Sequence, residues 1–186
     1  SATLENVDFL TNSPRAGGAL YAFFGQLDLQ NTTFTRNRSF GRAGAIMADQ
    51  ATAAINTTRF LGNQASSSGG AIDTVESTLL IANTEFVNNL SENGSGGAVK
   101  VDETTDLTLL NSALVENKAV QGGGIWAENA ALLTNSIFWS NQLSREGGPS
   151  QVEGPGGIAP ESANNIIQGL PGGFDPLFVL DPHPVP

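Results

Sequence analysis

The residues whose types and spacing could do chemistry form an acidic series that recurs along the chain. Glycine-rich words such as GGAI at residues 69–72 end on an apolar residue, and three residues later an acid follows in three of five cases. Two carboxylates gathered at one edge of a fold could hold Ca²⁺ or act as a general acid and base. The acids of this possible acidic edge are Asp49, Asp73, Glu76, Asp102, Glu103 and Glu128.

A solvated polar flank is the simpler explanation of the same acids, and the sequence favours it. Val75 interrupts the series, no Asp-x-Asp cluster or arginine column accompanies it, and the single histidine, His183, lies in a proline-rich tail. The chain has no cysteine, and neither a nucleophilic triad nor a metal-ligand spacing is present. The sequence therefore assigns no catalytic residue, no cofactor and no metal ligand.

A repeat of 24–28 residues supplies the elements that must position any such site. Six registers align on an aromatic column made of Phe9, Phe34, Phe60, Phe86, Leu114 and Phe138. Asparagine follows each of these positions by three residues and precedes five of the six by three residues. We expect two structural ladders from these columns, one containing Asn31, Asn83, Asn111 and Asn135, the other Asn37, Asn63, Asn89 and Asn117.

The segments between these landmarks are short and alternate apolar with polar residues, which is typical of strands joined by turns. Three short strands per repeat, each pairing with its counterpart in the next, give an all-β parallel β-helix of about six coils. Inward side chains would then stack on identical neighbours, and a small polar column, two residues before the aromatic one, should also point inward. Asn tolerates left-handed backbone at bends, and Gly-Gly allows close backbone approach.

The words GGAL, AGAI, GGAI, GGAV and GGGI, coupled with FLTN, FTRN, FLGN, FVNN, LVEN and FWSN, resemble the repeats of the polymorphic outer-membrane proteins of chlamydiae. They also resemble the wider bacterial class of right-handed parallel β-helix surface proteins. The likeness covers about residues 4–141, with mild departures at Ala43, Thr57 and Leu114. It implies a right-handed β-helix on an exported, cell-surface or extracellular protein, used for adhesion or structural assembly more often than for catalysis.

Polysaccharide lyases and hydrolases share the resembling fold, so an enzyme is the alternative function. Such an enzyme would use surface carboxylates such as Asp49, Asp73 and Asp102. A pocketed acidic groove would favour the enzyme, whereas a uniformly shallow surface would favour the scaffold.

The position one residue after the aromatic column is also mostly apolar, although the fold alone does not require this. Strand alternation points it outward, and an outward apolar stripe usually marks a covered or contacting face. A bend could instead turn it inward, or the tail's Phe174, Leu177, Phe178 and Leu180 could lie over it. The apolar members of this possible interface stripe are Leu10, Leu61, Val87, Val115 and Trp139.

The net charge of the chain limits the classes of partner that it can bind. The 186 residues contain 18 acidic and 8 basic side chains, a net charge of -10, which disfavours nucleic acid and an anionic membrane surface. No run of 18 apolar residues exists, so we expect no insertion into a bilayer. The remaining partners are a protein or cell surface, a second copy joined end to end or laterally, and a glycan.

We expect residues 1–145 to form the coils and residues 146–186, rich in Gly and Pro, to form an irregular cap or tail. Residues 164–170 could add one more strand. Because Leu4 falls in the strand before the Asn–Phe unit, the chain enters in the middle of a coil. An open sheet edge invites pairing, so we expect either a longer precursor or a chain that covers this end.

Overall fold

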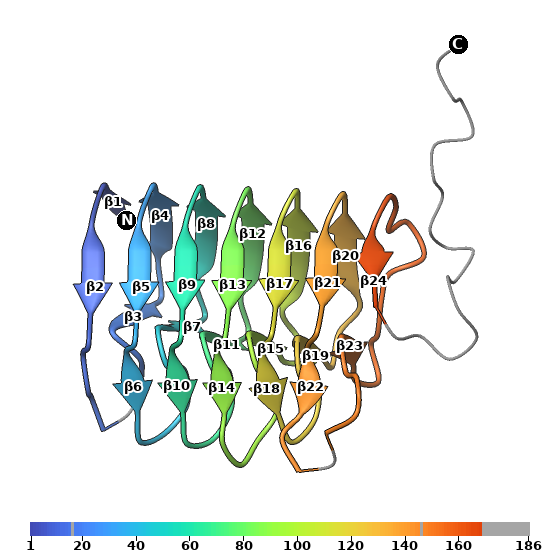
Figure 1. The fold of residues 1–186 in the computed structure, drawn as a ribbon. Helices are drawn as coiled ribbons and strands as arrows, with labels where there is room; N and C mark the ends of the chain where they lie inside the picture. Colours follow the sequence, from blue (N-terminus) through green and yellow to red (C-terminus); the bar gives the residue numbers. More distant parts are fainter. Residues whose placement is uncertain (16, 146, 169–186) are drawn as a thin grey trace.

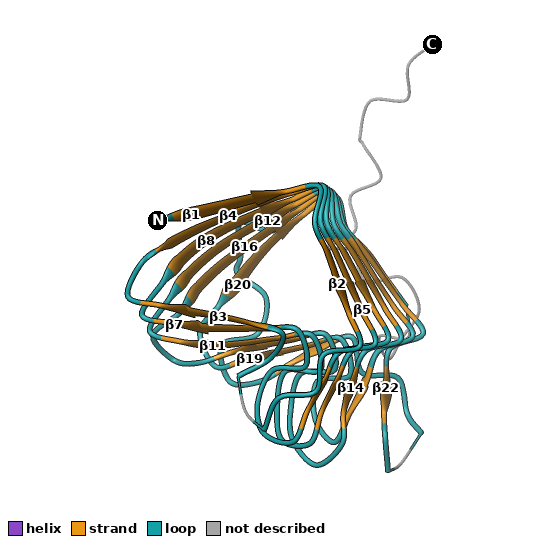
Figure 2. Cartoon of the chain, turned by 90° about the vertical axis from the view of Figure 1, so that its left-hand side faces the viewer, coloured by secondary structure: helices purple, strands orange, loops and turns teal. Residues whose placement is uncertain are grey.

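Each repeat of the sequence forms one turn of a parallel β-helix in the computed structural model, which describes residues 1–15, 17–145 and 147–168. The chain runs down the front face, beneath, and up the back as it advances from the N-terminal end (Figure 1), which is a right-handed coil. Figure 2 looks along the axis and shows three long sides and, at one corner, a smaller lobe of short strands and loops. The predicted fold class is confirmed.

Four sheets run the length of the solenoid, and all their strand pairs are parallel. Sheet A contains β1 (Ala2–Glu5), β4 (Gln26–Gln30), β8 (Thr52–Asn56), β12 (Thr78–Ala82), β16 (Asp106–Leu110) and β20 (Ala131–Thr134). Sheet B contains β2 (Asp8–Leu10), β5 (Thr33–Thr35), β9 (Arg59–Leu61), β13 (Glu85–Val87), β17 (Ala113–Val115), β21 (Ile137–Trp139) and β24 (Ile166–Ile167). Sheet C contains β3 (Leu20–Phe23), β7 (Ile46–Asp49), β11 (Ile72–Val75), β15 (Val99–Val101), β19 (Ile125–Ala127) and β23 (Val152–Glu153).

Sheet D is the fourth, where the sequence predicted three strands per coil. Its strands have two residues each, because the chain pairs only briefly after the buried asparagine before it enters a loop. Such short polar segments show no alternation by which to recognise a strand. They are β6 (Arg38–Ser39), β10 (Gln64–Ala65), β14 (Leu90–Ser91), β18 (Lys118–Ala119) and β22 (Gln142–Leu143).

The aromatic column of the sequence is the centre of the core. Phe34, Phe60 and Phe86 are fully buried and paired in register between neighbouring strands of sheet B. Their ring centroids lie 5.0 and 4.7 Å apart with nearly parallel planes, and Phe9 continues the stack at 4.6 Å from Phe34. The small polar column beside them is buried as well, as Thr32, Thr58 and Thr84 are in their coils.

A buried ladder of asparagines fixes the register of the coils at the end of sheet B. In the middle of the ladder, the Asn63 backbone N–H and side-chain amide both donate to Oδ1 of Asn89, at 2.9 and 3.0 Å. The same amide donates to the Phe34 carbonyl of the preceding coil at 2.9 Å. The pattern recurs at every step of a series that consists of Asn37, Asn63, Asn89, Asn117 and Asn141.

A second ladder is exposed at the bend between sheets A and B. Asn31, Asn83, Asn111 and Asn135 have φ between 46° and 52°, the left-handed geometry that Asn tolerates. The amide of Asn135 donates to Asn111 at 3.2 Å, and that of Asn111 to Asn83 at 3.4 Å. Thr57 interrupts this column with φ of 50°, although its branched side chain disfavours that conformation.

The glycine pairs close the corner before sheet C for two separate reasons. Gly69 has φ of +65°, which an L side chain rarely adopts. Gly70 has no such positive φ, but a Cβ at this residue would lie 2.0 Å from the carbonyl oxygen of Gly97 in the next coil. The second glycine is therefore required by coil-to-coil approach.

The sheets continue beyond residue 145. Strand β23 pairs with β19, and β24 pairs with β21, so two sheets extend into the segment expected to be an irregular cap. Residues 164–170 supply the additional strand that the sequence suggested, within its described part. The boundary between a coil domain and a tail stays a prediction.

Replacing Phe60 by Ala should lower the free energy of unfolding by about 3–5 kcal/mol, because it opens a cavity in the middle of the ring stack. Phe60→Leu is the matched control, since Leu114 already occupies this column, and its loss should be clearly smaller. Urea unfolding followed by circular dichroism measures both. Equal losses for the two variants would contradict a stabilising role of the stacked rings.

Thr57→Asn should raise the free energy of unfolding by about 0.5–1 kcal/mol, since Asn accepts left-handed φ and suits the exposed ladder. Thr57→Ala removes the branched side chain without adding an amide, so it should give less. Thermal unfolding of the three proteins measures the difference. A less stable Asn variant would show that backbone strain at residue 57 is not what limits this coil.

Candidate functional site

The apolar stripe lies on the outer face of sheet B. Along β9, Arg59 is exposed, Phe60 is buried and Leu61 is half-buried on the outside. At the two ends of the stripe, Leu10 and Trp139 are 57% and 47% exposed. Strand alternation therefore points these side chains away from the core. The tail residues Phe174, Leu177, Phe178 and Leu180, which could cover them, lie outside the described residues.

A second outward column widens this stripe, and the sequence reasoning missed it. It lies two residues earlier on each strand, and in the middle of the sheet it is an exposed ion pair between Arg59 and Glu85, 3.2 Å apart. Towards the C-terminal end it becomes apolar, with Ile137 43% and Ile166 50% exposed. Counting by two from the stripe would have found it. We call the apolar part of this joint surface the sheet B face: Leu10, Leu61, Val87, Ala113, Val115, Ile137, Trp139 and Ile166.

Asp73 of the acidic edge is not a solvated carboxylate. It is fully buried on the outer side of sheet C, where it is covered by a side chain from the loop after β6. Arg42 forms a bidentate pair with it, through Nε at 3.0 Å and through Nη2, and Ser68 donates to it as well. Both oxygens are thus engaged in holding a loop against the sheet.

Asp49 and Glu128 of the acidic edge also have their own donors. Asp49 accepts a hydrogen bond of 2.7 Å from the Tyr21 hydroxyl, and this bond raises the pKa of Tyr21. Glu128 lies between Lys100 Nζ at 3.3 Å and Trp126 Nε1 at 3.2 Å.

Glu76 and Glu103, the remaining glutamates of the edge, are exposed. The Gln50 side chain donates to Glu76 at 2.7 Å. Both carboxylates therefore lie at the solvated rim of the edge.

Asp102 is the acid whose protonation the surroundings shift. Burial raises its pKa, but the neighbouring Thr105 hydroxyl, the hydrogen bonds to Oδ2 from the Glu76 backbone amide and Thr104, and the charge of Lys100 outweigh burial and lower the pKa below its usual value. The carboxylate is therefore ionised at neutral pH and cannot serve as a proton donor there. Within the described residues, no group of three or more His, Cys, Asp or Glu is placed to hold a metal ion.

The described surface is shallow and polar at the corner between sheets A and B. A depression of about 320 Å³ is lined there by threonines, Asn31, Asn83, Arg59 and Glu85. It follows the exposed ladder and has no cluster of groups suited to chemistry. The described residues contain no helix that is long and apolar enough to cross a membrane.

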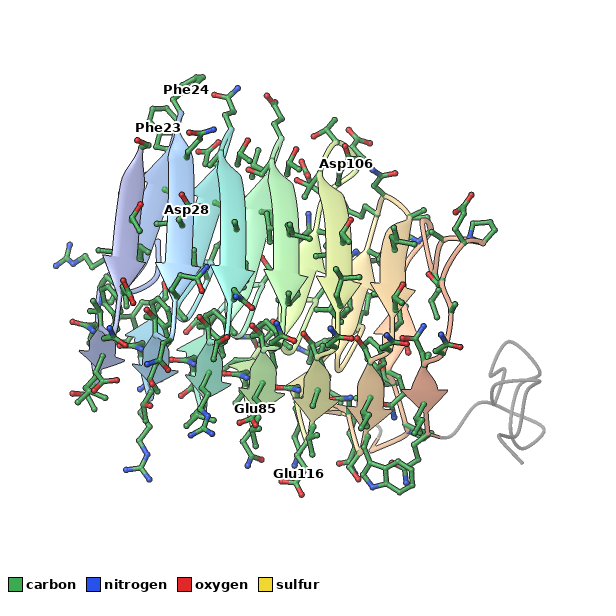
Figure 3. All side chains as sticks on the ribbon, turned by 90° about the horizontal axis from the view of Figure 1, so that it is seen from above. Phe23, Phe24, Asp28, Glu85, Asp106 and Glu116 are labelled. Carbon is green, nitrogen blue, oxygen red and sulfur yellow. The ribbon has the colours of Figure 1, made fainter. Side chains whose placement is uncertain are left out.

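An aromatic patch on the first coil is the least expected surface feature. Tyr21, Phe23 and Phe24 are 54%, 55% and 66% exposed. The Phe23 ring centroid lies 5.8 Å from that of Tyr21 and 4.3 Å from that of Phe24. Figure 3 shows Phe23 and Phe24 projecting together from the corner between β3 and β4 of the first coil. The sequence contained this signal, because these two phenylalanines replace the acids of the acidic series.

One family model matches the chain, that of the Chlamydia polymorphic membrane protein repeat, over residues 57–75. No curated protein and no solved structure gives a significant match. The matched segment runs from the bend before β9 to the end of β11 and includes the words FLGN and GGAI. The chain thus contains a chlamydial membrane protein type of repeat on a β-solenoid, as its resemblance predicted.

Asp102→Asn should lower the melting temperature at pH 7, because a carboxylate with a lowered pKa stabilises the fold above its unfolded pKa of about 3.9. That contribution is lost as pH falls through the lower folded pKa, so the difference between parent and variant should shrink in acid. Melting temperatures at pH 7, 5 and 3 measure it. A difference that is constant with pH would mean that the ionised form is not preferentially stabilised.

Proposed function

We propose that this chain is a non-enzymatic scaffold at a bacterial surface that uses the sheet B face to contact a protein partner. The observation on which the proposal rests is an outward apolar column sustained through five of six coils, although Thr35 shows that the fold accepts a polar residue there. Solvent-exposed apolar side chains lower solubility, and groups of them mark contact surfaces.

The family match supports the surface location. A chlamydial membrane protein repeat implies association with the outer membrane or cell surface, where a stiff rod can present side chains away from the cell. Adhesion and structural assembly both use such a rod. End-to-end or lateral contact between copies is the form of the proposal in which the partner is this chain itself.

The geometry of the acidic edge favours the scaffold over a polysaccharide-active enzyme. Asp73 is locked in its pair with Arg42, Asp49 accepts from Tyr21, and Asp102 has a lowered pKa. An acid and base pair needs one carboxyl group whose pKa is raised and which faces the substrate. The contacts of these three acids instead support a role in holding loops and coils together.

A variant with Leu61, Val87 and Val115 changed to Thr should lose partner binding at least tenfold while it keeps its fold, since Thr35 already occupies this column. Leu80→Thr with Leu110→Thr is the matched control on sheet A, where the neighbouring coil has Thr at both positions. Sedimentation velocity measures self-association, and binding of the labelled chain to intact cells measures adhesion.

The expected result is that the triple variant alone is impaired in at least one of the two assays. A triple variant that folds, sediments and binds cells as the parent does would contradict a contact role of the sheet B face.

A further inference from the structure

The aromatic patch of Tyr21, Phe23 and Phe24 does not belong to the sheet B face, since it lies on and just after β3 of sheet C. Phe23 contacts the rings of both Tyr21 and Phe24, and all three rings remain more than half exposed. It is therefore a separate surface, and what it binds is a separate question from the proposed function.

The architecture does not demand these rings. The residues in register with Phe23 in the next two coils are Asp49 and Val75. The residues that match Phe24 at the following corner are Gln50 and Glu76. Phe24 shares its φ of 48° with Gln50 and Glu76 at the same corner, at 51° and 47°, and a bulky aromatic residue is the one for which this conformation is least usual. The first coil thus places solvent-exposed rings where the next two coils have Asp49, Val75, Gln50 and Glu76.

The arrangement of the rings suits a cation. The planes of Phe23 and Phe24 meet at 70°, and the Asp49 carboxylate lies on the adjacent strand, oriented by the Tyr21 hydroxyl. Ring faces attract ammonium and guanidinium groups, and several rings beside a carboxylate are a recurrent way to hold them. The same protein shows the pairing at another exposed ring, because Arg38 lies 5.2 Å from the centroid of Phe40.

Charge decides between the kinds of cation. The chain has a net charge of -10, and Asp49 and Glu76 lie on the two coils next to the patch. Arg42, the nearby basic group, is held by Asp73. A zwitterionic phosphocholine headgroup would bring its phosphate against these carboxylates, whereas a lysine or arginine side chain brings positive charge alone.

We propose that the aromatic patch binds a lysine or arginine side chain of a basic segment of a partner protein. The rings contact the cation and its alkyl stem, and Asp49 and Glu76 attract it. The rod would then have two contact surfaces of different chemistry, an apolar one on sheet B and a cation-binding one on the first coil.

The test is an NMR titration of the full chain, labelled at phenylalanine and at its single tyrosine, Tyr21, with an acetylated, amidated Gly-Lys-Gly-Lys-Gly peptide. Separate arms use the same peptide with norleucine for lysine, free phosphocholine, and a neutral disaccharide. The variants Phe23→Val with Phe24→Gln should fold, because later coils have these residues at the matching positions. Leu80→Thr removes an exposed apolar side chain elsewhere and is the control.

The lysine peptide should shift the Phe23 and Phe24 resonances and bind the double variant about five-fold more weakly, which corresponds to about 1 kcal/mol. The control variant should bind as the parent does. Equal affinity for the double variant would reduce the effect to diffuse charge and overturn the proposal. Equal shifts with the norleucine peptide, stronger shifts with phosphocholine or the disaccharide, or none with the lysine peptide would also overturn it.

Discussion

The structure depends on the in-register hydrogen bonding of the buried asparagine ladder. Each of these side chains accepts from the backbone and amide of the asparagine one coil earlier, and donates to the carbonyl of the aromatic-column residue there, as Asn89 does with Asn63 and Phe60. At the last rung that acceptor is the Leu114 carbonyl, which accepts from Asn141. An asparagine amide buried without partners would cost free energy, so a coil is stable only when its neighbours hold the same register. The stacked rings and the glycine pairs also occur once per coil and lie against their counterparts in the next coil, so they require the same register.

This constraint separates the positions that serve the fold from those that are free to serve function. Inward columns repeat the same residue types, whereas outward columns change from coil to coil. Outward on sheet B, the column is Thr in one coil and Leu, Val or Trp in others. On sheet C, matching positions hold Phe23, Asp49 and Val75. Departures from the repeat on outward columns are therefore where function is to be sought, and departures on inward columns, such as Leu114, concern packing.

The sequence was sufficient to predict the solenoid, its register and the direction in which the stripe points. Two periodicities specify these features: the repeat of one coil, and the two-residue alternation of side chains along each strand. It was insufficient wherever a side chain meets a loop. Asp73 alternates to the outside of sheet C and was expected at an exposed edge, yet Arg42 and Ser68 bury it. Sheet D was missed for a related reason, since two-residue strands beside loops leave no alternation. The outward direction of Ile137 and Ile166 could have been predicted, because they follow the same two-residue period as the stripe.

Native-state hydrogen exchange tests the central claim most directly. The backbone amides of Asn63, Asn89 and Asn117 each donate to a buried side-chain oxygen of the next coil rather than to a backbone carbonyl. If the ladder holds the coils in register, these amides should exchange only through global unfolding, with the same free energy of opening as the best-protected amides of sheets A and B. Exchange at the rate of the exposed loops would show that the ladder opens locally, and would contradict the claim that the register depends on it.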